Sequence, residues 1–307
     1  MSESGPQRII ETMSLAVVGQ ESTLRLIVSA LLAGGHILLE DVPGVGKTLM
    51  AKTLARTIAG EFKRIQFSSD LMPTDVTGGN VFQPQGGTFR FVPGPIFAHV
   101  LLADEINRAS PRTQASLLEA MEEGWVTVDG ESHPLPRPFL VIATQNPVEF
   151  QGTFPLPEAQ LDRFALMLSL GYPSPEAEKE LLSGHWAREE SSGVAPVVTP
   201  DELLSWREEV HRVKVESSLQ DYMVKVVNET RAHPQVLLGV SPRGTLIWQR
   251  LAQAHAFVSG RSYVTPDDLR TVSGPVLAHR MLLVGRSTRP ERLAFLTELL
   301  SSIPVPV

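Results

Sequence analysis

Helical and strand-like apolar patterns alternate along the first half of the chain. Apolar residues recur at helical spacing over 9–17 and 24–32, and Gly34-Gly35 ends the second pattern. Short apolar and β-branched runs then predict strands at 37–39, 62–67, 100–103, 139–144 and 164–170, with helices between them that include 47–59 and 112–122. Strands that alternate with helices are typical of a parallel sheet with helices on both faces. We therefore expect an α/β fold for this half.

Two stretches interrupt this alternation, and each has strand-like residues on both sides of a glycine turn. The first spans about 78–95 around Gly86-Gly87, and the second spans about 124–136 around Asp129-Gly130. Each stretch comes directly before a strand of the predicted sheet. We expect two β-hairpins that project from the sheet domain.

The residues after 171 favour helices instead. The segment Gly171–Pro175 contains two prolines and breaks the alternation, and helical patterns dominate from there. A capping hydroxyl precedes a proline at three helix starts, Thr199-Pro200, Ser241-Pro242 and Thr265-Pro266. The length of 307 residues leaves room for two domains. We expect an α/β domain over 1–171 and a smaller all-α domain over 172–307.

The composition is that of an ordinary globular protein, with 42% hydrophobic and 20% charged residues, and it excludes several chemistries. The absence of cysteine excludes disulfides, thiolate nucleophiles and zinc sites that need sulfur, and it fits a reducing cytoplasm. The 27 Lys plus Arg against 34 Asp plus Glu give a net charge of -7, which argues against general binding to nucleic acid. The N-terminus shows no signal-peptide pattern, and no apolar stretch reaches the roughly 20 residues of a membrane span. We expect a cytoplasmic protein with no membrane span.

A glycine-rich loop joins the strand at 37–39 to the next helix. It reads Asp41-Val42-Pro43-Gly44-Val45-Gly46-Lys47-Thr48 and resembles a phosphate-binding P-loop. Glycines let backbone N–H groups surround a phosphate at a helix N-terminus, Lys47 can reach the β- and γ-phosphates, and the Thr48 hydroxyl can bind Mg²⁺. Asp41 stands where a glycine normally opens such a loop. Asp tolerates turn conformations, so we interpret the loop as a variant of the pattern, in which a carboxylate close to a triphosphate leaves the tightness of nucleotide binding open.

Two adjacent acids end the apolar strand at 100–103. Asp104 and Glu105 follow Leu101-Leu102-Ala103, and this pattern resembles a Walker B sequence. Asp104 would hold the Mg²⁺ shell, while Glu105 would orient and deprotonate the attacking water. On its own, an Asp-Glu pair at a strand end is typical of a solvated turn. Together with the glycine-rich loop it indicates ATP hydrolysis.

Three further polar residues suit the same chemistry. Asn146 follows the strand at 139–144 and can position water if that strand lies beside the other two sites, although Asn146-Pro147 is also a turn signal. Arg163 precedes the last predicted strand, and Arg243 opens a helix of the second domain. Both arginines suit a γ-phosphate. Each is typical of a surface residue when taken alone, so their roles depend on the neighbouring motifs.

Taken together, these motifs resemble those of a MoxR-family AAA+ ATPase, and the resemblance runs nearly end to end. It is most specific over 39–48, 93–122, 139–164 and 233–244. It implies a P-loop AAA+ core, with a parallel sheet flanked by helices, followed by a smaller all-α lid domain. The first hairpin resembles the insert in the family's helix 2, and the second resembles its pre-sensor hairpin. ATP and Mg²⁺ are the implied cofactors.

The resemblance also implies a role for each site residue. Besides the catalytic Glu105, it makes Asn146 the sensor 1 residue, Arg163 the arginine finger and Arg243 the sensor 2 residue. The implied nucleotide contacts are Val18 and Gly19 at the adenine, with Pro43, Gly44, Val45, Gly46, Lys47, Thr48, Leu49 and Asp104 around the phosphates. Thr48 would serve the Mg²⁺ directly, and Asp104 would serve it through water. Arg163 would complete the site of a neighbouring subunit, whereas the sequence leaves open whether Arg243 acts on the nucleotide of its own subunit or of a neighbour.

The implied assembly is a ring, a hexamer by this resemblance, that acts as a chaperone-like ATPase on a partner with a von Willebrand factor A domain and on its client. A P-loop small-molecule kinase would share the loop but not the arginine finger or the helical lid. A DNA-remodelling AAA+ ATPase would share every catalytic residue and is the stronger alternative. The net charge counts against it, and so do the two hairpin tips, which carry Gln83, Gln85 and Arg90, and Asp129, Glu131 and His133.

Overall fold

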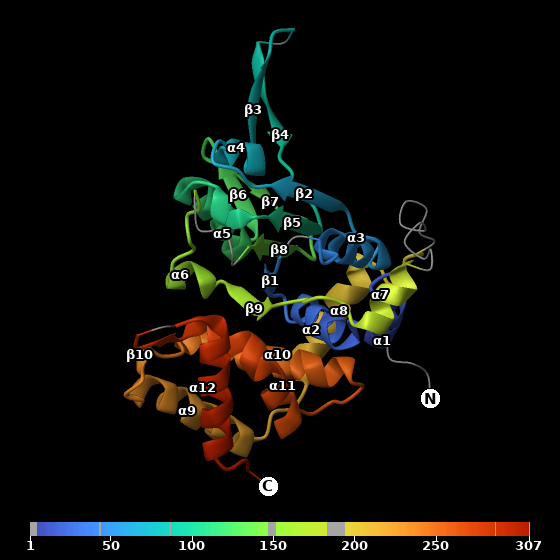
Figure 1. The fold of residues 1–307 in the computed structure, drawn as a ribbon. Helices are drawn as coiled ribbons and strands as arrows, with labels where there is room; N and C mark the ends of the chain where they lie inside the picture. The colour runs from blue at the N-terminus through green and yellow to red at the C-terminus, as the bar shows by residue number, and fades with distance from the viewer. Residues whose placement is uncertain are drawn as a thin grey trace.

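Buried strands form a parallel sheet in the middle of the molecule (Figure 1). The computed structural model describes residues 5–42, 44–85, 87–146, 152–182, 194–285 and 287–306. In this part of the chain the sheet has five strands in the order β2-β5-β8-β1-β9. Their bounds are β1 (His36–Glu40), β2 (Phe62–Gln66), β5 (Val100–Asp104), β8 (Leu140–Gln145) and β9 (Phe164–Leu168). All five are parallel, as the alternation of strands and helices predicts.

Alternate residues of these strands enter two apolar clusters, one on each face of the sheet. Leu39, Leu102 and Ile142 belong to the cluster on one face, which includes side chains of α1 (Gly5–Ser14), α2 (Glu21–Leu32) and α3 (Lys47–Thr57). Leu38, Leu101 and Val141 belong to the cluster on the other face, together with side chains of α5 (Pro111–Glu123). Burial on both faces explains why the central strands are continuous apolar runs.

The carboxyl ends of the strands meet at one edge of the sheet, because all the strands run in the same direction. The loops that follow β1, β5 and β8 therefore leave the sheet side by side. Strand β8 pairs with both β1 and β5, so the residue after β8 lies between the other two loops. In an open α/β sheet, the position where connections diverge to opposite sides is the usual place for a ligand.

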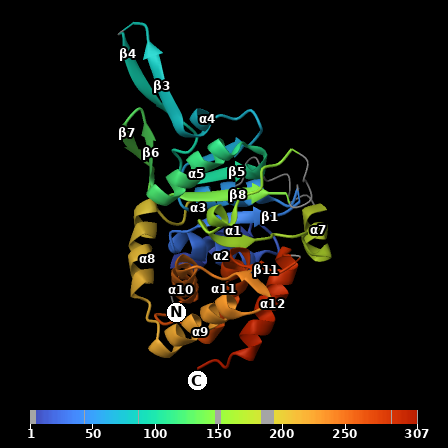
Figure 2. The same cartoon turned by 90° about the vertical axis from the view of Figure 1, so that its left-hand side faces the viewer.

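Two antiparallel hairpins extend beyond the sheet, at the two stretches where hairpins are predicted (Figures 1 and 2). The long one consists of β3 (Gly78–Gln83) and β4 (Thr88–Pro93), and it follows the short helix α4 (Pro73–Thr77). The short one consists of β6 (Trp125–Val128) and β7 (Glu131–Pro134). Asp129 and Gly130 both have positive φ, as a two-residue hairpin turn requires.

The lower part of the long hairpin contacts the turn and strand β7 of the short one. The Asn80 amide donates to the Asp129 carboxylate at 2.7 Å, and the rings of Phe91 and His133 stack with centroids 3.8 Å apart. Farther out, the exposed rings of Phe82 and Phe89 lie across the long hairpin, 5.3 Å apart. The long hairpin thus carries exposed aromatic side chains away from the body of the molecule.

Helices dominate the C-terminal part, as the sequence predicts. They are α7 (Pro175–Leu182), α8 (Pro200–Arg212), α9 (Ser217–Ala232), α10 (Pro242–Val258), α11 (Pro266–Leu277) and α12 (Arg289–Ser302). The hydroxyls of Thr199, Ser241 and Thr265 accept backbone N–H groups at the starts of α8, α10 and α11, which confirms the three predicted caps. Strands β10 (Val236–Leu238) and β11 (Leu282–Leu283) also pair here; they are too short for the pattern to reveal.

The helical part packs directly against the layer of helices that covers the sheet. Helices α8 and α10 both contact α2, and a single apolar cluster includes side chains from α1–α3 and from α8–α12. In Figure 2, α8 lies along the side of the molecule beside this layer. The division into 1–171 and 172–307 therefore stays a prediction. Short elements complete the described chain: η1 (Ile106–Arg108), α6 (Glu158–Leu161) and η3 (Ala278–Arg280).

Candidate functional site

A polar cavity of about 370 Å³ opens at the carboxyl edge of the sheet. Loops after β1, β5 and β8 contribute side chains to it, as does the edge strand β2. Its lining residues are Gly44, Gly46, Lys47, Thr48, Leu49, Arg64, Gln66, Asp104, Glu105 and Asn146. Eight of these ten positions are ones that the sequence proposes for nucleotide binding or catalysis. The topology of the sheet brings them together from segments up to a hundred residues apart.

The glycine-rich loop has the backbone geometry that a bound phosphate needs. Gly44 and Gly46 have φ of 87° and 90°, in the left-handed region where a side chain would be strained. Gly46 is also the N-cap of α3, so the first N–H groups of that helix point toward the cavity. The Lys47 ammonium donates to the backbone oxygens of Asp41 and Val42 at 3.2 and 3.4 Å. An anion at the helix N-terminus would face both the N–H groups and this ammonium.

The Asp41 carboxylate faces away from the cavity. It is buried, and it accepts hydrogen bonds from the Ser169 hydroxyl at 2.6 Å and from the backbone N–H groups of Leu170 and Gly171 at 2.7 and 3.0 Å. These hydrogen bonds from the segment that follows β9 stabilise the negative charge of the carboxylate. The carboxylate thus does not line the cavity, and its effect on nucleotide affinity stays a prediction. Asp41 instead joins the start of the loop to the segment leading toward the helical part.

The Asp104 carboxylate is held by two partners at the end of β5. One oxygen accepts from the Thr144 hydroxyl at 2.6 Å, and the other accepts from the Arg64 guanidinium at 2.7 Å. Thr144 also accepts the Glu105 N–H at 2.9 Å, which ties β5 to β8 just before the two loops diverge. Arg64 additionally donates to the Gln66 side chain at 3.2 Å.

The Glu105 carboxylate has a different set of partners, although it is the next residue. The same oxygen, Oε2, accepts from the Gln66 amide at 2.7 Å and from the Arg108 guanidinium at 2.9 Å. Glu105 itself has a left-handed backbone conformation, with φ of 56°, which turns the chain from β5 into η1. Each of the two acids is thus paired with its own arginine.

Asn146 is buried at the end of β8, between the glycine-rich loop and the two acids. The sequence predicts a role for Asn146 only if its strand lies beside the other two sites. Strand β8 does pair with both β1 and β5. Thr48 and Asp104 supply a hydroxyl and a carboxylate to the same cavity, and these oxygen donors suit Mg²⁺. No group of three His, Asp or Glu side chains suited to a metal occurs among the described residues.

Arg163 and Arg243 lie outside this cavity, in a second hollow of about 270 Å³. Both bind the same carboxylate, that of Glu122 at the end of α5, at 3.3 and 2.6 Å respectively. Arg163 directly precedes β9, so it lies at the amino edge of the sheet, the edge opposite the cavity. At about 3.3 Å per residue, the five residues of β9 alone separate the two edges by about 16 Å.

The remaining predicted contacts lie around the cavity. Val18 and Gly19 form the turn between α1 and α2, and the next residue, Gln20, donates to the Leu170 oxygen at 2.8 Å. Leu170 also binds Asp41, so this turn lies beside the start of the glycine-rich loop. Val45 is half-buried in the loop without lining the cavity. Pro43 lies outside the described residues.

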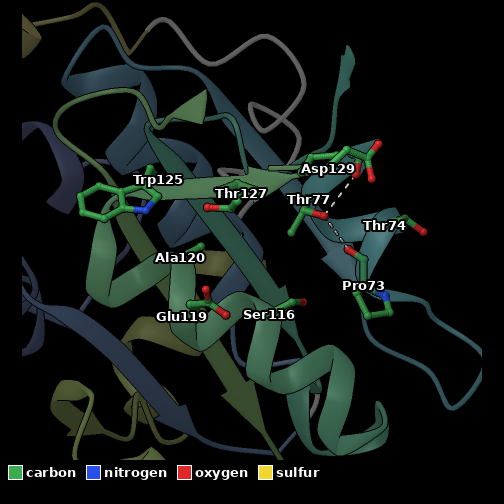
Figure 3. A pocket seen from close by; sticks show the side chains of 12 residues that line it. Pro73, Thr74, Thr77, Ser116, Glu119, Ala120, Trp125, Thr127 and Asp129 are labelled. Atoms are coloured by element: carbon green, nitrogen blue, oxygen red, sulfur yellow. Dashed lines mark hydrogen bonds between the residues drawn. The ribbon is translucent and has the colours of Figure 1, made fainter. Parts of the chain in front are cut away.

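A third hollow, of about 280 Å³, lies between α4, α5 and β6 (Figure 3). It is lined by hydroxyl-bearing side chains, Trp125 and the acids Glu119 and Asp129, and its lining contains no lysine or arginine. Two carboxylates without a cation would repel a triphosphate. This hollow is therefore not a candidate for nucleotide binding.

Sequence reasoning missed Arg64, Gln66 and Glu122, which contact predicted site residues. Arg64 and Gln66 are polar residues two apart on one strand, so their side chains point to the same face. The pairing of Gln66 with Asp104 in the sheet brings both to the two acids. That pairing depends on strand order, which the pattern does not provide. Glu122 falls in the polar end of a helix and carries no sequence signal of its own.

Two family models match the chain. One describes the ATPase family associated with various cellular activities (AAA) and covers residues 36–166. The other describes an AAA lid domain and covers residues 228–298. The first match includes β1, β2, β5, β8 and the first part of β9, and the second includes α10, α11 and most of α12.

Similar proteins come from several bacteria. Uncharacterized protein YeaC of Bacillus subtilis is 46% identical over 302 residues, covering 98% of this chain and 94% of YeaC. Chaperone MoxR1 of Mycobacterium tuberculosis is 42% identical over 291 residues, covering 90% of this chain and 75% of that protein. A crystal structure from Cytophaga hutchinsonii, of a protein assigned provisionally as an ATPase, has a TM-score of 0.87 and 36% identity, covering 97% of this chain and 94% of its own.

Proposed function

The chain belongs to the MoxR family of AAA+ ATPases, and from this premise we propose that it hydrolyses Mg-ATP at a site divided between two copies of the chain. The observation that carries the proposal is the placement of the charged groups. The P-loop, the two acids and Asn146 line one cavity, whereas Arg163 and Arg243 lie at the opposite edge of the sheet. Neither Arg163 nor Arg243 therefore reaches the cavity of its own copy.

The first half of the proposed site binds the nucleotide. The N–H groups at the start of α3 and the Lys47 ammonium would surround the β- and γ-phosphates. Mg²⁺, held by the Thr48 hydroxyl and the Asp104 carboxylate, would neutralise charge on the phosphates. The turn of Val18 and Gly19 would line the adenine, which is supported by its position next to the segment that binds Asp41.

The same cavity also supplies the groups that act on water. The Glu105 carboxylate would accept a proton from the attacking water, and the buried Asn146 amide would orient that water. Gln66 and Arg108 both donate to one oxygen of this carboxylate, Oε2.

The second half of the site would come from a neighbouring copy. Arg163 and Arg243 share Glu122, so the two guanidinium groups form one positively charged surface at the edge of the molecule. Placed against a neighbour's cavity, both would contact the γ-phosphate and stabilise the charge that develops on it. Arg243 therefore acts in trans, like Arg163, and the arrangement repeats from copy to copy round a closed ring, a hexamer in this proposal.

The partner that we propose is a protein with a von Willebrand factor A domain, together with its client. The exposed Phe82 and Phe89 rings suit an apolar protein surface, whereas the acidic Asp129 and Glu131 of the second hairpin would repel a nucleic-acid backbone. ATP hydrolysis can drive such a partner only if the ATP and ADP states bind it differently. Equal affinity of both states for the purified partner would contradict this part of the proposal.

Two substitutions test the nucleotide site directly. Lys47→Ala should weaken ATP binding at least tenfold, because the phosphates lose their nearest cation. Glu105→Gln should bind Mg-ATP with nearly unchanged affinity and hydrolyse it at least a hundredfold more slowly, because an amide cannot accept the water's proton. Calorimetry with a non-hydrolysable analogue measures the first effect, and phosphate release measures the second. Unchanged affinity in Lys47→Ala would argue against the P-loop assignment, and unchanged turnover in Glu105→Gln against the assigned base.

A further inference from the structure

Arg64 forms an ion pair with Asp104, the carboxylate that is proposed to serve Mg²⁺. Its guanidinium donates to Asp104 at 2.7 Å, and it lines the same cavity as Lys47 and Thr48. It comes from β2, the edge strand of the sheet, and nearly half of its side chain is exposed, at 47%. The Asp104 side chain is only 13% exposed and has Thr144 as its other partner. Arg64 is therefore the more exposed member of the pair, and Asp104 the more enclosed one.

A guanidinium and a divalent cation compete for one carboxylate oxygen. Both are positive, and at contact distance their repulsion would be substantial even at a surface. The other Asp104 oxygen already accepts the Thr144 hydroxyl. Binding of a cation close to Asp104 is consequently favoured when Arg64 has moved away from the carboxylate.

We propose that Arg64 is a positioning residue that occupies the Asp104 carboxylate until a divalent cation enters with the nucleotide, and so sets how strongly nucleotide binding depends on that cation. This inference rests on the proposed nucleotide function of the cavity. Arg64 has two opposite effects here. Without the cation it neutralises Asp104 and reduces the repulsion between that carboxylate and the triphosphate. With the cation it competes for the same oxygen, because molecules with a released Asp104 are favoured to bind the ion.

The measurable quantity is a ratio of two dissociation constants for the non-hydrolysable ATP analogue AMP-PNP, one in EDTA and one in saturating Mg²⁺. This ratio expresses the coupling between cation and nucleotide. Arg64→Gln should weaken binding in EDTA and leave it equal or tighter in Mg²⁺. The ratio should therefore rise about three- to tenfold, the size expected when a partly exposed ion pair is removed from a cation's ligand.

Three further variants distinguish this role from a general change of charge. Lys63→Gln removes the same charge from the neighbouring residue of β2, where Lys63 binds Glu61 at 3.0 Å, and should leave the ratio unchanged. Arg64→Lys keeps the charge and should stay close to wild type. In an Asp104→Asn background, Arg64→Gln should no longer change the ratio, because the carboxylate through which it acts has gone. Circular dichroism verifies that each variant is folded.

Each alternative result has a definite meaning. An unchanged ratio in Arg64→Gln overturns the inference. Equal weakening in EDTA and in Mg²⁺ also overturns it, because Arg64 would then be a phosphate ligand. A rise of the same size in Lys63→Gln overturns it in favour of a general electrostatic effect. If wild type binds no AMP-PNP under either condition, the proposed nucleotide function itself fails, which is a different result from the other three.

Discussion

His36 begins β1 as a buried imidazole with a partner at each nitrogen. Its Nε2–H donates to the Met121 oxygen at 3.0 Å, and its Nδ1 accepts the Val141 N–H at 3.0 Å. A neutral ring satisfies both bonds, whereas a protonated ring would place a second N–H against the Val141 donor. Burial lowers the pKa of His36 to about 4, and the hydrogen bond to Met121 only partly opposes this, while the nearby Arg207 and Arg243 lower the pKa further.

This pKa makes stability depend on pH between about 6.5 and about 4. In that range an unfolded His36 takes up a proton and a folded one does not, so unfolding is favoured as the pH falls. From about pH 7 to about pH 5, His36 should contribute a loss of about 2 kcal/mol to the free energy of unfolding. Urea unfolding of wild type and of His36→Gln at both pH values measures this. The variant should lose about 2 kcal/mol less than wild type over that interval.

His211→Gln is the matched control for this experiment, because His211 is exposed on α8. It should lose as much stability as wild type between the two pH values. The prediction fails if His36→Gln and wild type show the same pH dependence.

Some single residues could be assigned from the sequence and others could not. Gly44, Lys47 and Thr48 occur within one short stretch with a fixed spacing, so local order is enough to predict that they lie together. The direction of the Asp41 side chain depends instead on Ser169 and Leu170, which are almost 130 residues away. Nothing local to Asp41 indicates those partners. A position that looks unfavourable beside a phosphate is therefore satisfied by a distant segment.

Individual elements were more predictable than their pairings. The four inner and C-terminal strands β1, β5, β8 and β9 are apolar runs whose length and flanking residues indicate a strand, and the capped helix starts carry proline and hydroxyl signals. The strand order is a property of the packed sheet. That order explains why Gln66 lies beside Asp104, and the direction of β9 explains why Arg163 lies far from the P-loop.

One group of polar contacts links the helical part to the amino edge of the sheet, where Arg163 lies. The Arg280 guanidinium is buried after α11 and donates to the Asp162 carboxylate at 2.7 Å, and the Ser241 hydroxyl at the start of α10 donates to the other Asp162 oxygen at 3.0 Å. Burial lowers the pKa of Arg280 to about 10, although Asp162 opposes that shift and the guanidinium stays charged. The residue before Arg163 is therefore held by the helical part.

Asp162→Asn should destabilise the protein by about 3 kcal/mol, because it leaves a buried guanidinium without its counter-charge. Urea unfolding at neutral pH measures the change. Glu208→Gln removes a carboxylate from an exposed position on α8 and should change stability by less than about 0.5 kcal/mol. A loss in Asp162→Asn no larger than that of the control would show that the pair does not hold these elements together.

At the scale of the whole molecule, the two edges of the sheet carry different parts of one chemistry. The carboxyl edge has the P-loop and the acids, and the amino edge has Arg163, Arg243 and their shared Glu122. The sequence identifies both groups, and the family resemblance predicts that Arg163 serves a neighbour's site while leaving Arg243 open. The direction of β9 is consistent with this prediction, because it separates Arg163 from the cavity by the length of a strand. No helix among the described residues is long and apolar enough to cross a membrane.

The central claim, that the ATPase site is divided between two copies, is tested most directly by mixing two inactive variants. Arg163→Ala retains Glu105, and Glu105→Gln retains Arg163, so an interface between the two variants restores one complete site. Each variant alone should bind ATP and hydrolyse it at least a hundredfold more slowly than wild type. Once subunit exchange has been demonstrated by energy transfer between labelled copies, the mixture should regain a measurable fraction of wild-type phosphate release. If the exchanged mixture stays as inactive as its components, Arg163 does not act across the interface and the divided site is contradicted.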